Sequence, residues 1–275
     1  MPDVAGVRVL ITGGTSGLGL AMARGLVNSG ARVLVTGRDT DRVRGAVSTL
    51  SGCPGSIDGI VMDVRDEASV RRGVDEAVQR LRGLDVLVNN AGLGMRHVNP
   101  RFLSEPQPFW EVAADGFREV VDTNLTGYFL VARAVAPRFV EQGHGKIINI
   151  SMNHETMRRR GFVPYGPSRA GAESLSAIMA ADLADHGVTV NMLLPGGATV
   201  TGMIPDDVPA AVRDALLDPA IMEEPVRWLS SADSDGVSGE RVVATEFDAW
   251  LKDHLRATRR TEIGSRGADF SSWRE

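Results

Sequence analysis

Lysine, cysteine and tyrosine are scarce in this chain of 275 residues. Only Lys146 and Lys252 are lysines among its 30 basic residues, so arginine supplies almost all of the positive charge. A genome-level preference for arginine codons explains this bias most simply. Cys53 is the only cysteine, which excludes an internal disulfide and suits a reducing cytoplasm. Tyrosine occurs twice, and one of the two is Tyr165.

Long hydrophobic runs and a strong charge of one sign are also missing. No stretch approaches the roughly 20 apolar residues that a membrane helix needs. The first residues, Met1 to Val4, lack the basic region and apolar run of a secretory signal. A net charge of -5 and a pI near 5.6 argue against a nucleic-acid surface. We therefore expect a cytoplasmic protein that binds neither membrane nor nucleic acid.

Short apolar runs alternate regularly with helical patterns along the chain. Strands are expected at residues 7–12, 32–36, 59–62, 84–88, 146–150, 188–194 and 241–245. Helical patterns lie between them, among them residues 18–28, 41–50, 67–82 and 165–186. This alternation predicts an α/β fold with a doubly wound parallel sheet of about seven strands. We expect a single domain over residues 1–255 and a polar C-terminal tail over residues 256–275. A frayed tail is favoured over a partner-binding arm, although Phe270 and Trp273 support the arm.

A glycine-rich segment, Thr-Gly-Gly-Thr-Ser-Gly-Leu-Gly at residues 12–19, joins the first expected strand to the first helix. Glycine there permits a tight turn and close approach of the backbone to a pyrophosphate. The N-terminus of the following helix then presents free N–H groups to that anion. Its position between strand and helix favours a nucleotide site over a generic loop.

The spacing T-G-x-x-x-G-x-G and several later motifs resemble the short-chain dehydrogenase/reductase family. The later motifs stand in family order: Asp63-Val64, Asn89-Asn90-Ala91-Gly92, Asn124, Tyr165 and Pro195-Gly196. The resemblance runs from about Val7 to about Thr245. It implies a Rossmann-type fold and an oxidoreductase that moves hydride between a nicotinamide cofactor and a carbonyl/secondary-alcohol pair. It also implies a homodimer or homotetramer, formed through the helices around residues 112–140 and 167–183.

The resemblance also assigns cofactor contacts. It puts the glycine-rich segment at the pyrophosphate, Asp63 and Val64 at the adenine, Asn90 at the ribose, and Pro195 and Gly196 at the nicotinamide. Asn89 is expected to brace the sheet instead. Either Thr199 or Thr201 would bond the carboxamide, and Thr201 is preferred. The implied cofactor-binding residues are Gly13, Thr15, Ser16, Gly17, Leu18, Gly19, Arg38, Asp63, Val64, Asn90, Ala91, Gly92, Tyr165, Arg169, Pro195, Gly196, Thr199 and Thr201.

The end of the second expected strand bears on cofactor choice. NAD enzymes commonly place a carboxylate there to accept from the ribose 2′-hydroxyl. This chain has Gly37 followed by Arg38, whose guanidinium can grip a 2′-phosphate. NADP(H) is therefore predicted over NAD(H). Asp39, which is negative, and Ser16, which adds no second positive charge, argue against NADP(H). The alternative is that Arg38 is only a solvated residue at the start of a helix.

In the family, a serine, a tyrosine and a lysine four residues after it handle the proton, and an asparagine supports a relay water. Tyr165 and Asn124 match two of these positions, but Arg169 stands where the lysine is expected. A guanidinium can favour tyrosinate and bond the ribose, but it does not readily release a proton. We therefore expect cofactor binding to be kept and proton relay to be impaired.

The serine position is altered too, since Met152 lies thirteen residues before Tyr165. Ser151 is adjacent, but neighbouring strand residues point to opposite faces, so its side chain is expected to point away from the substrate. Asn153 and a re-registered Ser151 are therefore ranked as replacement donors above His154.

Several cations flank the expected substrate pocket: Arg96, His97, Arg101 and residues 158–160. They either steer an anionic substrate or form solvated surface and oligomer contacts. Residues 203–217 are expected to cover the pocket.

Two functions remain open at this level. The first is the oxidoreductase with Tyr165 as acid and base, Arg169 and Asn124 in support, and Ser151 or Asn153 as donor. The second is a nucleotide-binding protein with little catalysis and a regulatory or structural role. Met152 and Arg169 favour the second, and intact Tyr165 and Asn124 favour the first.

Overall fold

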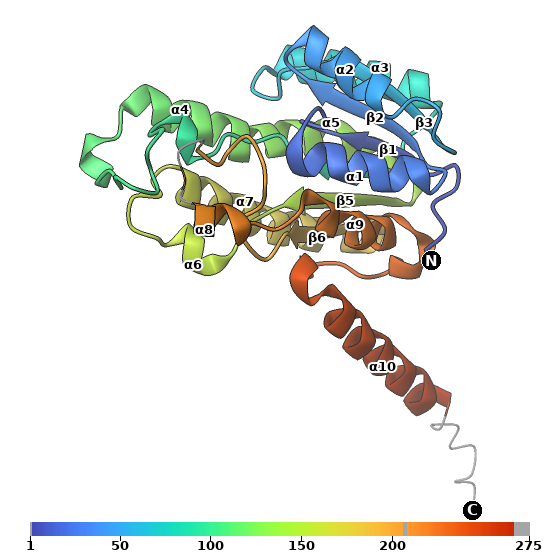
Figure 1. Cartoon of the computed structure of the whole chain (residues 1–275). Coiled ribbons are helices and arrows are strands. Elements are labelled where there is room, and N and C mark those ends of the chain that lie inside the picture. Colours follow the sequence, from blue (N-terminus) through green and yellow to red (C-terminus); the bar gives the residue numbers. More distant parts are fainter. Residues whose placement is uncertain (1, 206–207, 209, 267–275) are drawn as a thin grey trace, which may run out of the picture.

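A parallel seven-stranded sheet between two layers of helices forms the body of the protein (Figure 1). The computed structural model describes residues 2–205, 208 and 210–266, the last ten of these by their backbone alone. The strand order is β3-β2-β1-β4-β5-β6-β7, which confirms the predicted Rossmann-type architecture. The strands are β1 (Arg8–Ile11), β2 (Arg32–Gly37), β3 (Ser56–Val61), β4 (Val86–Asn89), β5 (Gly145–Ile150), β6 (Val188–Leu194) and β7 (Arg241–Val243).

Side chains of each strand alternate between the two faces of the sheet. Val9 and Ile11 of β1 join one buried cluster, which packs against α1 and α9. Leu10 of the same strand joins the other cluster, on the side of α3, α5 and α7. Burial on both faces explains why the strands are continuously apolar in sequence. The helices are α1 (Gly17–Asn28), α2 (Thr40–Thr49), α3 (Glu67–Leu81), α4 (Ala114–Val121), α5 (Gly127–Gln142), α6 (His154–Met157), α7 (Tyr165–Asp182), α8 (Ala210–Asp214), α9 (Glu223–Ser230) and α10 (Phe247–Arg266).

The chain reverses its direction of winding at the centre of the sheet. Strand β1 pairs with β2 on one side and with β4 on the other. Such a reversal leaves a crevice at the carboxyl ends of the strands, where ligands of this architecture bind. The glycine-rich segment and the loops after β4, β5 and β6 all open onto that end.

Helices α4 and α5 form one long rod with an irregular turn between them. Residues Asp122–Thr126 form a π-helical turn there, and Asn124 lies inside it. Such turns are rare and are frequent at functional sites.

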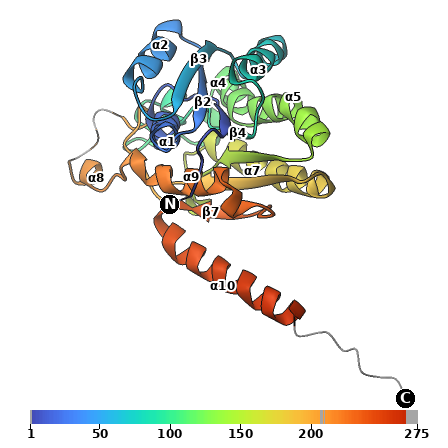
Figure 2. The same ribbon diagram turned by 90° about the vertical axis from the view of Figure 1, so that its right-hand side faces the viewer.

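The C-terminal helix α10 crosses the predicted boundary between residues 255 and 256. In both views it leaves the body of the domain (Figure 1 and Figure 2). The limits of domain and tail therefore stay a prediction, and Phe270 and Trp273 lie outside the described residues. The segment between β6 and α9 holds α8, within the residues expected to cover the pocket, and a 3-10 turn at Pro219–Met222. None of the helices described is long and apolar enough to cross a membrane.

Candidate active site

A cavity of about 1280 Å³ runs along the carboxyl ends of the strands. This volume exceeds the usual range for one drug-sized ligand, so it suits a dinucleotide and a second small molecule together. Its wall is formed by the glycine-rich segment, the ends of β2 and β3, and the loops after β4, β5 and β6. All predicted site residues line it except Asn124.

The glycine-rich segment fits a close backbone approach. Gly13 and Gly17 have φ angles of +64° and +52°. Residues other than glycine rarely adopt such positive φ angles. A Cβ at Gly13 would meet the Cα of Ala91 at 2.7 Å, and one at Gly19 would meet Asn90 Nδ2 at 2.4 Å. These glycines therefore let the segment pack closely against Asn90 and Ala91 while it lines the cavity, where a pyrophosphate is expected.

The two asparagines at the end of β4, Asn89 in the strand and Asn90 just after it, brace the fold. Asn90 Nδ2 donates to the carbonyl oxygens of Thr12 and Gly13, each at 2.9 Å. This ties the loop after β4 to the glycine-rich segment. Asn89 Nδ2 donates to Asn149 Oδ1 at 3.0 Å, in keeping with its expected bracing role. Asn90 therefore shapes the cavity with its amide nitrogen, and contact with a ribose remains a proposal.

Arginines gather at the end of the cavity beyond β2 and β3. Arg38, Arg42 and Arg65 all line it. Asp39 is occupied as the N-cap of α2, where its carboxylate accepts from the Arg42 backbone N–H at 2.8 Å. Because its carboxylate caps the helix, Asp39 is a weaker argument against binding of a 2′-phosphate at this end of the cavity.

The carboxylate of Asp63 is held by Arg65, whose Nη2 lies 2.7 Å from Oδ2. Hydrogen bonds from the Arg65 side chain outweigh burial and lower the pKa of Asp63. Because Arg65 already holds both oxygens, an adenine amine would share the carboxylate with it.

The Arg169 guanidinium is buried between the only two tyrosines. It is 2% exposed, and its Nη1 donates to the Tyr128 hydroxyl at 2.6 Å and to the Ile150 carbonyl at 2.8 Å. Its Cζ lies 5.4 Å from the ring centre of Tyr128 and 5.5 Å from that of Tyr165. Among the described residues, Arg169 has no carboxylate partner, and its buried Nε has no hydrogen-bond partner.

The ionisation of this cluster follows from its contacts. Burial lowers the pKa of Arg169, but interactions with Tyr128 and Tyr165 outweigh burial and raise that pKa above its ordinary value. Burial raises the pKa of Tyr128 despite the opposing effect of Arg169. The pair is therefore a buried cation beside a neutral phenol, and the cation has no compensating anion.

Asn124 lies beneath the cavity and is fully buried. Its Oδ1 accepts from the Leu93 backbone N–H at 2.8 Å, and its Nδ2 donates to the Leu93 carbonyl at 2.9 Å and to Ser168 Oγ at 3.0 Å. The side chain thus links the π-helical turn, the loop after β4 and the start of α7. The Asn124 side chain does not reach the cavity. It could therefore support a relay water only by holding these three segments in place.

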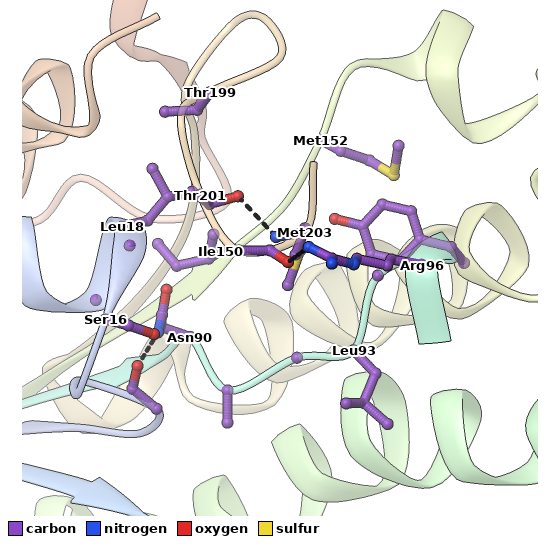
Figure 3. A pocket seen from close by; sticks show the side chains of 18 of the residues that line it. Ser16, Leu18, Asn90, Leu93, Arg96, Ile150, Met152, Thr199, Thr201 and Met203 are labelled. Carbon is purple, nitrogen blue, oxygen red and sulfur yellow. Dashed lines mark hydrogen bonds between the residues drawn. The ribbon is translucent and has the colours of Figure 1, made fainter. Parts of the chain in front are cut away.

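The serine position is filled by Met152, which lines the cavity (Figure 3). Ser151 also lines the cavity, and its Oγ donates to Glu173 Oε1 at 2.5 Å, so the hydroxyl proton is engaged by that carboxylate. Hydrogen bonds from Ser151, Arg241 and His154 outweigh burial and lower the pKa of Glu173. Asn153 Nδ2 donates to the Gly196 carbonyl at 2.8 Å, which leaves its second N–H uncommitted.

The loop after β6 closes the cavity on the opposite side. Gly196 has a φ of +95°, and a Cβ there would meet Thr245 Oγ1 at 2.0 Å. Thr199 turns its hydroxyl back to the Gly197 carbonyl at 3.2 Å, whereas Thr201 lies against Gly17. The Thr201 hydroxyl accepts from the Met203 backbone N–H at 3.4 Å (Figure 3), and the choice of Thr201 over Thr199 stays a prediction.

One end of the cavity is apolar. Met95, Phe102, Met152 and Phe162 form what we call the apolar wall, and Phe102 and Phe162 meet edge to face at 5.6 Å. Residues 203 and 204 lie over it, where Arg96 Nη1 donates to the Ile204 carbonyl at 3.2 Å.

Most of the predicted cations at this end have protein partners. His97 contacts Glu119, and Arg101 pairs with Glu105 at 2.9 Å. Arg159 lies over the Phe162 ring at 5.4 Å. The field at this rim is thus weaker than the count of cations suggests.

Four contributors were missed by the sequence analysis. Arg42 and Arg65 line the cavity, Tyr128 holds Arg169, and Glu173 holds Ser151. Arg42 lies in the first turn of α2, close in sequence to Arg38, and this closeness could have pointed to it. The scarcity of tyrosine could have pointed to Tyr128, whereas nothing in the sequence singles out Glu173.

Comparisons with known proteins agree with this geometry. The short chain dehydrogenase family model matches residues 7–210. Gluconate 5-dehydrogenase of Gluconobacter oxydans is 32% identical over 194 residues, which cover 70% of this chain and 72% of that enzyme. The 2,5-dichloro-2,5-cyclohexadiene-1,4-diol dehydrogenase of Sphingobium indicum is 33% identical over 207 residues, or 74% of this chain and 79% of that enzyme.

Solved structures point the same way. A short-chain type dehydrogenase/reductase from Mycobacterium marinum superposes with a TM-score of 0.76 at 28% identity, covering 88% of this chain and 94% of that one. Sequence motifs, fold and relatives therefore agree with the resemblance noted in the sequence. The chain belongs to the short-chain dehydrogenase/reductase family and is an oxidoreductase.

Proposed function

We propose that this protein transfers hydride between NADP(H) and a carbonyl/secondary-alcohol pair, with Tyr165 as general acid in reduction and base in oxidation. The observation that carries this proposal is the buried, unpaired cation of Arg169 stacked 5.5 Å from the Tyr165 ring in the cavity. A cation at that place favours tyrosinate, and a tyrosine that exchanges a proton with a carbonyl oxygen needs such help. Nucleotide binding alone needs no such pair.

The residues of the cavity divide the work. When bound, the cofactor would supply or accept the hydride at its nicotinamide, in the space between Gly196 and Tyr165. Tyr165 would exchange the proton with the substrate oxygen. Arg169 would bond the ribose with Nη2 and favour tyrosinate. Of the two residues that could replace the serine as hydrogen-bond donor to the substrate oxygen, we favour Asn153, because the Ser151 hydroxyl already donates to Glu173.

We propose NADP(H) over NAD(H) because positive charge surrounds the end of β2. Gly37 carries no carboxylate, Arg38 and Arg42 line the cavity, and Asp39 is committed to its helix cap. A guanidinium at that position can bond a 2′-phosphate bidentately.

Replacing Arg38 with leucine should weaken NADPH binding by about tenfold, the usual loss for one charge-assisted hydrogen bond. NADH binding should stay unchanged, because NADH lacks the phosphate. Both affinities can be measured from the fluorescence of the bound nicotinamide. Arg44→Leu is the matched control, since Arg44 is an exposed arginine of the neighbouring helix α2 that pairs with Asp41 and does not line the cavity. A wild-type preference for NADH would refute the NADP(H) assignment.

We propose a substrate whose carbonyl is carried on an apolar body. The apolar wall offers dispersion contacts and few hydrogen-bond partners. The two relatives named above act on gluconate and on a chlorinated cyclohexadiene diol, and this wall favours a compound of the second kind. An anionic group on the substrate could still reach Arg159 at the rim.

A carbonyl panel followed by NADPH absorbance tests this function. It should include neutral cyclic ketones, aliphatic ketones and keto-gluconates. We expect turnover, with higher kcat/KM for the neutral cyclic ketones than for the keto-gluconates. Tight NADPH binding without turnover of any member would refute the enzyme assignment and support the second candidate, a nucleotide-binding protein without catalysis. Met152, which lines the cavity and cannot donate a hydrogen bond, is the observation that favours that candidate.

We also propose a homo-oligomer formed through α5 and α7. Phe129 of α5 and Ile178 of α7 are 44% and 56% exposed. These exposed apolar side chains, one on each helix, support such a subunit contact.

A further inference from the structure

We infer that Tyr128 is a positioning residue for this site: its hydroxyl is the anchor that fixes Arg169 beside Tyr165. This inference rests on the proposed role of Arg169, but it names a residue outside the family motifs. Tyr128 acts through the guanidinium alone, because it is 1% exposed and does not line the cavity. Its pKa is raised by burial, so it remains a neutral acceptor.

The anchor is a closed triangle of three polar groups. The Tyr128 hydroxyl accepts from Arg169 Nη1 at 2.6 Å and donates to the Ile150 carbonyl at 3.2 Å. The same carbonyl accepts from Nη1 at 2.8 Å. Each group of the triangle therefore has its partner inside the protein.

Fixing one nitrogen of a guanidinium fixes the others, because the group is planar. With Nη1 held by Tyr128 and Ile150, Nη2 lies against the loop after β4, where a Cβ at Gly92 would meet it at 2.4 Å. Nη2 is thus the nitrogen left to serve the cofactor. A lysine has one terminal nitrogen and would need no such internal anchor.

Without this hydroxyl, the buried charge would be held poorly. Nε of Arg169 has no partner, and no carboxylate contacts the group within the described part of the chain. Within the described part of the chain, Nη1 would then keep only the Ile150 carbonyl as acceptor. A buried cation that loses such an acceptor would be drawn toward water in the cavity, where it would intrude on the cofactor.

A double-mutant cycle on NADPH affinity tests this inference. The variants are Tyr128→Phe, Arg169→Met and the double replacement, and the probe is NADPH itself, followed by fluorescence. We expect Tyr128→Phe alone to weaken NADPH binding by about tenfold, as for a lost hydrogen bond to a charged group. In the Arg169→Met background the same replacement should have no effect. Ser176→Ala removes another buried hydroxyl, bonded to Asn149, and should leave NADPH affinity unchanged.

Additive effects of the two replacements, or an unchanged affinity in Tyr128→Phe, would overturn the inference. If Tyr128→Phe does not fold, Arg169→Lys gives a second route. In Arg169→Lys, Tyr128→Phe should again cost no affinity, and a tenfold loss there would overturn the inference. Because this test measures NADPH affinity, it is independent of turnover. Absence of turnover would refute the proposed function, whereas the coupling between Tyr128 and Arg169 is decided by the affinities alone.

Discussion

Replacing Tyr165 with phenylalanine is expected to lower turnover by about a thousandfold, within the range that a positioned general acid contributes. The ring that stacks on Arg169 is kept, so NADPH affinity should stay unchanged. Steady-state oxidation of NADPH with the best ketone of the panel gives the rate. Fluorescence titration of NADPH gives the affinity.

Thr156→Val is the matched control for this replacement. Thr156 also lines the cavity, so its loss removes a hydroxyl from the same wall without touching the proposed acid. We expect its turnover to stay near that of the wild type. If Tyr165→Phe also turned over at the wild-type rate, another group would have to supply the proton.

Replacing Arg169 with methionine is expected to lower turnover by about a hundredfold, because the charge that favours tyrosinate is lost. NADPH affinity should fall as well, since Nη2 faces the cofactor side. Thermal stability should stay equal or rise, because an apolar side chain often matches or exceeds a buried charge in stability. Kinetics, NADPH titration and thermal melting measure the three quantities.

A loss of activity without a loss of stability would show that the buried charge serves function. Arg133→Met is the control, because Arg133 lies on the exposed side of α5 and pairs with Glu67 at 2.9 Å. It should leave turnover unchanged. Arg169→Lys keeps a positive charge, and faster turnover in that variant would show an attenuated reductase. Full activity in Arg169→Met would contradict the role given to Arg169.

The sheet and the glycine-rich segment could be predicted because both depend on local sequence. Adjacent residues of a strand, such as Val9 and Leu10, face opposite buried clusters, and both are apolar because both faces of the sheet are covered. Gly13 and Gly17 adopt positive φ angles that few other residues reach. Such requirements appear directly in the sequence as residue type and spacing.

The catalytic side was predicted less completely because its contacts join distant segments. Tyr128 and Arg169 are separated by 41 residues, and Ser151 and Glu173 by 22. Neither pair follows from spacing along one helix or strand. The same holds for the apolar wall, whose members come from two separate loops. Sequence motifs thus identified Tyr165 and Arg169, which both line the cavity, but not the groups that hold them.

The strongest test of the central claim is hydride transfer itself, followed with NADPH that carries deuterium at nicotinamide C4. The product alcohol of the best ketone can be analysed by mass spectrometry. The account predicts that wild-type protein delivers deuterium to the carbinol carbon, and that Tyr165→Phe delivers almost none while binding the cofactor equally well. Bound NADPH with no deuterium in any product, or equal transfer by both proteins, would contradict it.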